Sequence, residues 1–350
     1  MASPARTLAG RRPSSRSIAE RPRALTQWLH AHGELAVTPL AATRITTGRV
    51  NISWAISDGI GQQWVLRERR PGAAHDFSRE ATTLRATRRL GLPVPRVIGH
   101  YDAVGERPFM VTARACGVTL DGEDDADRLT PTQRRTVAFN VVTTLAQLHR
   151  VDPATVGLPR FGAEYADRQL AAVSDVWTRS GSYGVHDSAW RAVRARLVDR
   201  RPHKEGRATL LHGDFRLPNL VLHHDAVGAI VDWDCCTAGP PLADLAWMLV
   251  NWRSPTEPPA YPPSPTRAGG FPSREELISD YSEATNFALD ELPYYRAMAH
   301  WRGAALLQAE LDRQRAHGLD KHTRPLDIGV VDDAIADHLM KAATFLRSPQ

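Results

Sequence analysis

Two neighbouring segments decide the fold of this chain: residues 211–219, with the sequence LHGDFRLPN, and residues 230–234, with the sequence IVDWD. Between them, short apolar runs flank the turn-forming sequence DAVG at residues 225–228. This pattern predicts a β-hairpin, with its first strand at 220–223 and its returning strand at 229–233. The polar side chains of both segments are therefore expected at the same end of one hairpin.

The predicted hairpin brings oxygen ligands together. With the turn at its centre, Asp232 lies opposite about Val221 and within one or two residues of Asn219. An amide oxygen beside a carboxylate, with coordination positions left for substrate phosphates, suits Mg²⁺. Asp214 precedes Asn219 by five residues on the same loop and can face the hydroxyl group of an acceptor. This is the logic of a kinase catalytic loop, in which one Asp orients or deprotonates the nucleophile while an Asn and a second Asp hold metal.

Further segments extend the pattern along the chain. They are WVLR at 64–67, Arg79–Glu80, LPVP at 92–95, LAQLH at 145–149, GPPLADLA at 239–246 and the Pro-rich segment 262–277. Together with the HGDx4N and VDWD motifs, this set resembles the aminoglycoside phosphotransferase/choline kinase-like family over about residues 25–345. The Pro-rich segment is similar to the branch of that family found fused to acyl-CoA dehydrogenases in animals.

The resemblance implies an α+β, bilobal protein-kinase-like fold, with a small β-rich N-lobe and a larger helical C-lobe. It also implies ATP as the phosphoryl donor, Mg²⁺ as the cofactor and a small-molecule hydroxyl as the acceptor. By motif position, Asp214 matches the catalytic aspartate, and Asn219 and Asp232 match the metal ligands.

The same resemblance assigns the nucleotide to the N-lobe. The family uses a turn that covers the phosphates, a strand cation braced by a helix glutamate, and a hinge whose backbone meets adenine. Arg67 stands where the family usually carries Lys, and an Arg is a planar fork rather than a point charge. The residues that match the turn are Gly48 and Asn51, and Ala113 and Ala115 match the hinge. Arg67 matches the strand cation and Glu80 the helix glutamate.

The pattern along the chain predicts two domains after a basic tail. Residues 1–24 hold six arginines and one acid without an apolar stretch, which predicts a disordered tail, although transit peptides have a similar composition. Residues 25–115 predict an N-lobe of four short strands and one helix, and residues 116–350 a helical C-lobe. The resemblance implies that the N-lobe binds the nucleotide and that the C-lobe is catalytic and binds the acceptor. A cleft between two such lobes is where ligand sites tend to lie.

The boundaries of these elements follow from periodicity and from helix start signals. Strands are expected at 44–47, 51–56, 63–67 and 108–112, with a helix at 77–90. Helices of the second lobe are expected at 131–149, 164–178, 187–200 and from 274 to about 347, with a Pro-rich loop at 255–272.

Composition excludes several classes of protein. The chain has 350 residues, 42% hydrophobic and 24% charged, and no run approaches the ~18 apolar residues that a membrane span needs. The tail accounts for the net charge of +5, so residues 25–350 are neutral and give no argument for nucleic-acid binding. Cys116 and the adjacent Cys235 and Cys236 cannot form a disulfide framework. We therefore expect a cytoplasmic protein with no membrane and no nucleic-acid partner.

Several residues near the motifs have structural interpretations. His212 is expected to hydrogen-bond the backbone, and Asp244 to cap a helix and support the catalytic loop. Cys235 and Cys236 are expected to be buried, with side chains that point apart. The acidic run 121–127 predicts a solvated loop, or a surface that attracts a cationic substrate.

The motifs leave the acceptor open. Segment 253–273 offers apolar side chains, including Tyr261 and Phe271, with one acid and two bases. It favours an acceptor with an apolar body, with or without an anionic group, over an amino sugar. The alternatives are an aminoglycoside or other antibiotic phosphotransferase and a catalytically silent kinase-like binding module. A protein kinase is disfavoured, because Gly213 stands where protein kinases carry Arg and the interval 232–244 is too short for an activation loop.

Overall fold

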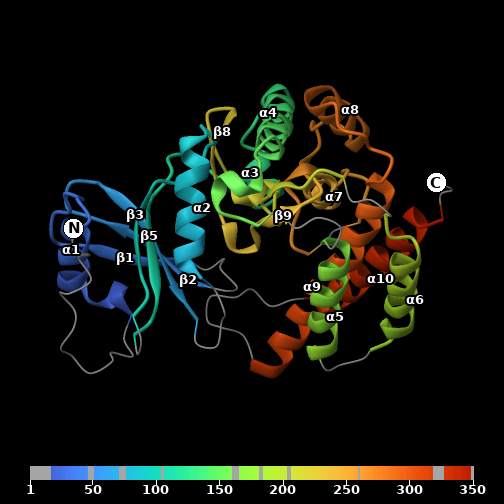
Figure 1. Ribbon diagram of the computed structural model, residues 1–350, viewed down its shortest axis with the longest axis horizontal. Coiled ribbons are helices and arrows are strands. Elements are labelled where there is room, and N and C mark those ends of the chain that lie inside the picture. The colour runs from blue at the N-terminus through green and yellow to red at the C-terminus, as the bar shows by residue number, and fades with distance from the viewer. Residues whose placement is uncertain are drawn as a thin grey trace. The chain divides into compact units, whose positions relative to one another are not determined.

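The chain divides into two compact units, Met1–Cys116 and Gly117–Gln350. The computed structural model combines an N-terminal sheet with a helical C-terminal portion (Figure 1), which confirms the predicted α+β class. The residues described are 17–45, 51–70, 76–103, 106–159, 165–180, 184–202, 206–258, 261–317 and 327–347.

The first unit is built on an antiparallel sheet with the strand order β1-β2-β3-β5-β4. Its strands are β1 (Ala41–Ile45), β2 (Asn51–Ser57), β3 (Gln63–Arg69), β4 (Val97–Tyr101) and β5 (Phe109–Ala113). Helix α1 (Pro22–Ala31) shares a hydrophobic core with Trp64 and Leu66 of β3. Because side chains alternate along a strand, Arg67 lies on the opposite face, where it reaches helix α2 (Phe77–Arg89). Helix α2 packs against β4 and β5 (Figure 1).

The predicted elements of this unit are present, but two further elements were not predicted. Within the described residues the unit has five strands and two α-helices, rather than four strands and one helix. The omitted elements are α1 and β4. Strand β4 is an edge strand of five residues that follows a Pro-rich turn, and its sequence VIGHY has too little alternation to mark a strand.

The expectation of a disordered tail over residues 1–24 is wrong from residue 17 onwards; residues 1–16 lie outside the described part. Glu68 of β3 is fully buried, and a buried carboxylate needs hydrogen-bond donors. Ser17 Oγ donates to it at 2.7 Å and the Ile18 amide at 2.8 Å, and the Ile18 side chain is itself buried. Residues 17–19 are therefore buried against the core of the first unit.

The second unit is mainly helical, and its helices begin where capping signals stand. Thr130 and Ser273 each form a capping box with the residue three positions later, at the starts of α4 and α8. The elements are α3 (Glu123–Ala126), α4 (Pro131–His149), α5 (Tyr165–Arg179), α6 (Asp187–Asp199), β6 (Thr209–Leu211), β7 (Leu220–His223), β8 (Ala226–Ile230), β9 (Thr237–Gly239), α7 (Leu242–Asn251), α8 (Arg274–Thr285), α9 (Leu292–His317) and α10 (Ile328–Phe345).

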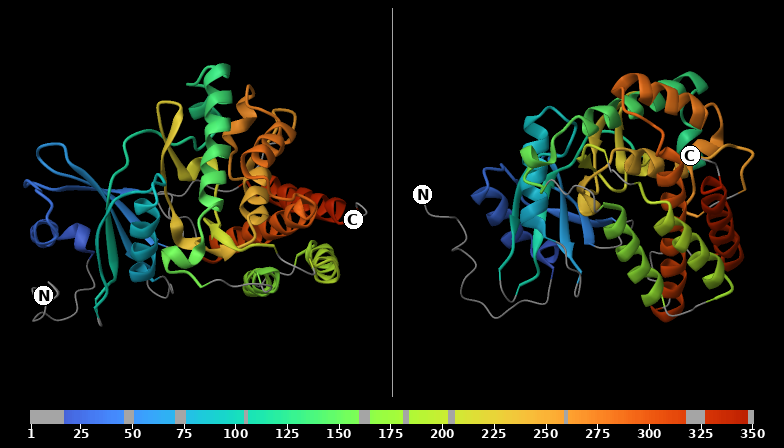
Figure 2. Two further views of the ribbon diagram at one scale, coloured as in Figure 1. Left: turned by 45° about the horizontal axis from the view of Figure 1, so that its top comes forward. Right: turned by 45° about the vertical axis from the view of Figure 1, so that its right-hand side comes forward.

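Helix α9 organises this unit. It contacts α5, α6, α7 and α10, and it runs alongside α10 in both views of Figure 2. Trp190 of α6 stacks between Trp177 of α5 and Trp301 of α9, with ring centroids 4.7 and 4.6 Å apart. No helix in the described part of the chain combines the length and the apolar character needed to span a bilayer.

A buried ion cluster makes the stability of the second unit depend on pH. Burial raises the pKa of Glu257, but hydrogen bonds from Arg274 and the charges of Arg274, Lys341 and Arg253 lower it to about 2. A carboxyl whose pKa is lower in the folded state stabilises the fold above its unfolded pKa, and this stability is lost as the pH falls from about 4.5 towards 2. Glu257→Gln should lower the free energy of unfolding by about 2–3 kcal/mol near neutral pH.

Urea denaturation near pH 7 and near pH 3 measures this effect. The difference between wild type and Glu257→Gln should shrink at the lower pH. Glu275→Gln, which changes an exposed acid on α8, is the matched control and should have little effect at either pH. An equal loss at both values would contradict the charge-based explanation.

Candidate active site

The hairpin that carries the two motifs is present, but its turn lies closer to the first strand than predicted. Strand β7 ends at His223 and β8 begins at Ala226, so the turn is His224–Asp225 rather than 225–228. His224 adopts a left-handed conformation, and the register shifts where Gly228 is passed over as a bulge. Val221 therefore pairs with Ala229 and not with Asp232.

The shifted register still brings the two motifs together. Leu220 pairs with Ile230, and the Val231 amide donates to the Asn219 carbonyl at 2.9 Å. Asp232 follows directly, with a left-handed backbone (φ 66°) that Asp and Asn tolerate better than most residues. Asn219 accepts this hydrogen bond and Asp232 directly follows its donor, so the two residues lie together at the end of the hairpin.

Asp244 of α7 holds the loop that carries Asp214 through hydrogen bonds to its backbone. The Asp244 carboxylate is buried and accepts the amides of His212 and Gly213 at 2.6 and 2.8 Å. His212 Nε2 donates to the Val231 carbonyl, and its Nδ1 accepts the Asp214 amide. The backbone contact expected of His212 and the loop support expected of Asp244 are confirmed, but Asp244 does not cap a helix: it lies inside α7, whose N-cap is Pro241.

The Asp214 carboxylate accepts hydrogen bonds on both oxygens. Trp247 Nε1 donates to Oδ1 at 2.7 Å, and Asn219 Nδ2 to Oδ2 at 2.7 Å. Arg216 Nε approaches both oxygens at 3.2 Å. Burial raises the pKa of Asp214, but the charges of Arg216 and Arg302 and the Trp247 hydrogen bond outweigh it, so the net shift is downward. Asp214 is therefore an anion at neutral pH.

The residues matched to the metal fit Mg²⁺. Both Nδ2 protons of Asn219 are directed at Asp214, to its carbonyl and to Oδ2, which turns the amide oxygen Oδ1 away from that loop. Asp232 is exposed at the neighbouring position. Among the described residues no group of three or more His, Cys, Asp or Glu could hold a metal ion. One amide and one carboxylate oxygen, completed by phosphates and water, is a usual Mg²⁺ environment.

In the first unit, the structure pairs the two charged residues matched to the phosphates. Arg67 Nη1 donates to Glu80 Oε1 at 2.5 Å, both side chains are mostly buried, and the Arg67 guanidinium lies 5.8 Å from the centroid of the Phe77 ring. Asn51 is buried as the first residue of β2, paired with Arg69. Gly48 lies outside the described residues.

The two residues matched to the hinge, Ala113 and Ala115, differ in the hydrogen bonding of their backbone amides. The Ala113 amide donates to the Arg96 carbonyl at 2.8 Å, so this amide already has an acceptor within the protein. Ala115 lies two residues beyond the end of β5 and is partly exposed. Of the two amides, that of Ala115 is the better candidate donor to a base.

Three contacts of the catalytic loop were not found from the sequence. Trp247 and Arg216 hydrogen-bond Asp214, and Arg302 of α9 donates to the Gly213 carbonyl at 2.9 Å. The Arg302 guanidinium also covers the Trp247 ring, 4.3 Å from its centroid. Trp247 and Arg302 are 33 and 89 positions from their loop partners, and no local pattern marks either residue.

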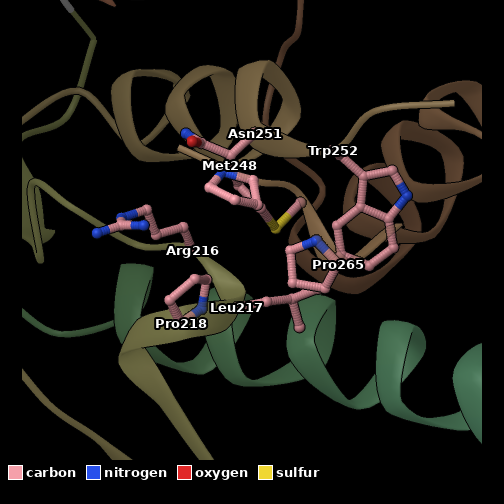
Figure 3. Close-up of a pocket in the computed structure, with 8 residues that line it drawn as sticks. Arg216, Leu217, Pro218, Met248, Asn251, Trp252 and Pro265 are labelled. Atoms are coloured by element: carbon pink, nitrogen blue, oxygen red, sulfur yellow. The ribbon is translucent and has the colours of Figure 1, made fainter. Parts of the chain in front are cut away.

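A pocket opens beside this loop, in the second unit. It is small and partly open to solvent, and it is lined by Arg216, Leu217, Pro218, Met248, Asn251, Trp252, Pro263 and Pro265. Figure 3 shows Arg216 at one end and Trp252 at the other, with Met248 between them. Phe271, expected in the lining, instead packs edge-on against Trp252, and Tyr261 is not among the lining residues.

The acidic run near the pocket is largely paired with arginines. Arg267 contacts Glu123, Arg128 contacts Asp125, and Arg134 contacts Asp127. For Asp121, partial desolvation and the charge of Asp125 raise the pKa, while the nearby Arg216 lowers it. These pairs reduce the negative potential that the run could present to a cationic substrate.

The expectation that both adjacent cysteines are buried is wrong. Cys235 is exposed and Cys236 is partly exposed. The cause is local, because residues Trp233–Cys235 form a single 3₁₀ turn instead of continuing the strand, and Trp233 takes the buried position.

Comparison with known proteins shows the family. A model described as "Phosphotransferase enzyme family" matches residues 41–277, and the chain belongs to this family. Among curated proteins, human acyl-CoA dehydrogenase family member 11 is 30% identical, with 83% of this chain and 38% of that protein covered. Mouse acyl-CoA dehydrogenase family member 10 is 27% identical, with 86% and 29% covered. The chain thus spans less than two fifths of the length of these relatives.

Solved structures share the fold. A Ralstonia eutropha protein carrying the name aminoglycoside phosphotransferase has a TM-score of 0.72 at 21% identity, covering 93% of this chain and 97% of that one. A variant of aminoglycoside phosphotransferase APH(4)-Ia, solved with ADP and hygromycin B, has a TM-score of 0.58 at 16% identity, covering 93% and 97%. At these identities the likeness concerns the fold, and the acceptor has to be argued from the site.

Proposed function

We propose that the chain is an ATP-dependent O-phosphotransferase that transfers the γ-phosphoryl group to a hydroxyl of a small, non-aminoglycoside acceptor. One observation carries the proposal. The Asp214 carboxylate is fixed by Trp247 and Asn219 beside a small pocket, and Asn219 and Asp232 lie together at the end of the adjoining hairpin with the amide and carboxylate oxygens that suit Mg²⁺. A loop with only a structural role has no need of this set.

Asp214 would act on the acceptor. Its anionic carboxylate accepts a hydrogen bond from the hydroxyl and takes the proton as the acceptor oxygen bonds to the γ-phosphorus and the bond to the leaving ADP oxygen breaks. Trp247 and Asn219 hold the carboxylate in one orientation, so positioning supplies much of the rate. Asn219 and Asp232 would hold Mg²⁺, which neutralises charge on the phosphates.

The first unit would bind the nucleotide. Arg67, oriented by Glu80, would offer guanidinium donors to the phosphates, and by motif position Gly48 and Asn51 are assigned to the segment that would cover them. Backbone groups at Ala113 and Ala115 would meet adenine, with Ala115 as the amide donor.

Loss of the cation should weaken ATP use. Arg67→Ala should raise the apparent KM for ATP by about 10- to 100-fold and depress turnover, because a charge-assisted hydrogen bond contributes about 1.5–3 kcal/mol. Arg67→Lys should retain part of the activity. Arg79→Ala, an exposed neighbour of Glu80, is the control and should behave as wild type. Wild-type ATP affinity by calorimetry together with unchanged turnover in Arg67→Ala would disprove the role.

The pocket supports an acceptor with an apolar body. Leu217, Met248 and Trp252 supply apolar surface, and among the described lining residues only Arg216 carries a charge. Aminoglycosides are polycations, which a site with carboxylates would bind through charge pairing. This lining lacks such carboxylates among the described residues, and most acids of the nearby run are already paired with arginines.

We expect kanamycin-type compounds to be poor substrates. The test is an ATP-consumption screen of the purified protein against aminoglycosides, macrolides, amino alcohols, sugars and hydroxy acids, with product detection by mass spectrometry. A kcat/KM above ~10⁴ M⁻¹s⁻¹ for an aminoglycoside would make the protein an antibiotic-modifying enzyme instead. Nucleotide binding without turnover of any acceptor would favour a catalytically silent module.

A further inference from the structure

Hydrogen-bond donors of the protein already occupy the acceptor positions of the Asp214 carboxylate, which the hydroxyl of the acceptor has to reach. Each carboxylate oxygen has about two acceptor positions. Oδ1 receives Trp247 Nε1 and Arg216 Nε, and Oδ2 receives Asn219 Nδ2 and Arg216 Nε. An incoming hydroxyl therefore competes with one of these three side chains.

Two of the three donors are held firmly. Trp247 is buried in α7 with Arg302 stacked on its ring, and its bond to Asp214 is short at 2.7 Å. Asn219 is 6% exposed and donates a second bond to the Asp214 carbonyl. Neither side chain can leave without breaking other contacts.

Arg216 is held more weakly. Its Nε shares one proton between two oxygens at 3.2 Å, long for a charge-assisted bond, and its side chain is 24% exposed. The residue also lines the pocket, at the end opposite Trp252 (Figure 3). A guanidinium has five N–H donors, and those beyond Nε are available for planar recognition of an anion.

We propose that Arg216 is the acceptor-recognition residue of this site and that it covers Asp214 until an anionic group of the acceptor draws it away. An acceptor with a carboxylate or phosphate beside its hydroxyl would bind the Arg216 guanidinium in the pocket and free the Asp214 oxygens for the hydroxyl. A neutral acceptor would have to displace Arg216 without compensation. The inference rests on the proposed function and names the acceptor class: hydroxylated, apolar and anionic.

Asp121 is the other carboxylate whose charge interacts with Arg216. It is not part of the pocket lining, and the desolvation and like charge around it disfavour its ionised form. Because Asp121 lies outside the pocket lining, it does not occupy the place beside Arg216 that an anionic group of the acceptor would take in the pocket.

The experiment compares hydroxyalkanoates of increasing chain length with their primary amides, which keep the size and hydroxyl but lack the charge. In the wild type, kcat/KM should favour the acid over its amide by about 10- to 100-fold, the range that a charge-assisted hydrogen bond supplies. In Arg216→Gln this preference should vanish, because kcat/KM for the acid falls to the level of the amide. Arg135→Gln, which removes an exposed arginine on α4, should keep the wild-type preference.

Calorimetric binding of the same probes separates this inference from the proposed function. Tighter binding of acids than of amides, lost in Arg216→Gln, supports the anion site even if no probe is phosphorylated, in which case the proposed function fails alone. Equal binding of acid and amide by the wild type would overturn the inference. So would an equal fall in turnover of both probes in Arg216→Gln, which would make Arg216 only a support for Asp214.

Discussion

Asp232→Asn should abolish most of the phosphotransferase activity. The substitution removes the only formal charge from the proposed Mg²⁺ ligand pair, and the metal neutralises charge that develops on the transferred phosphoryl group. A loss of several kcal/mol in transition-state stabilisation corresponds to a fall in kcat of about 10³-fold. The measurement is turnover of the best acceptor in saturating MgATP, with the Mg²⁺ dependence recorded in parallel.

The geometry makes Asp232→Asn a clean test. Asn tolerates the left-handed backbone at residue 232 as Asp does, so the variant should fold normally. Asp225→Asn makes the same change in the turn at the far end of the hairpin and should leave turnover intact. Unchanged turnover in Asp232→Asn would remove the metal assignment.

Asp244→Ala should cause a large loss of stability together with a loss of activity. The change leaves the buried amides of His212 and Gly213 without their acceptor, at about 1–3 kcal/mol each, so the free energy of unfolding should fall by about 3 kcal/mol. Urea denaturation measures the stability. Since the same amides set the position of Asp214, kcat should fall more than the affinity for ATP.

Asp244→Asn provides the graded comparison. Its amide oxygen can still accept one of the two backbone donors, so roughly half of the lost stability should return. Asp124→Ala removes an exposed acid from α3 and should leave stability unchanged. If Asp244→Ala were as stable as Asp124→Ala, the carboxylate would not support the loop.

The proximity of the motif residues was predictable because it depends on short sequence distances. Asp214 and Asn219 share one loop, and the hairpin to Asp232 covers few residues, so motif spacing places the three together even with the turn misplaced. Helix α4 was similarly predictable, because Thr130 and Gln133 form a capping box within one turn.

The parts that were missed depend on packing between distant segments. The buried position of Ile18 follows from Glu68, which is 50 residues away, and no local pattern in the Arg-rich N-terminus indicates it. Trp247 and Arg302 reach the loop that carries Asp214 because α7 and α9 pack against each other. Motif spacing within the sequence does not indicate tertiary contacts of this kind.

The close packing at Gly213 limits how this loop could evolve. Its backbone is left-handed (φ 80°), and a Cβ atom there would lie 2.4 Å from the Cys235 carbonyl oxygen. An arginine at this position, which protein kinases use to sense a phosphorylated activation loop, therefore cannot arise here by one substitution. The 233–236 segment would first have to move, so an arginine could arise at residue 213 only through a double change whose first step brings no benefit.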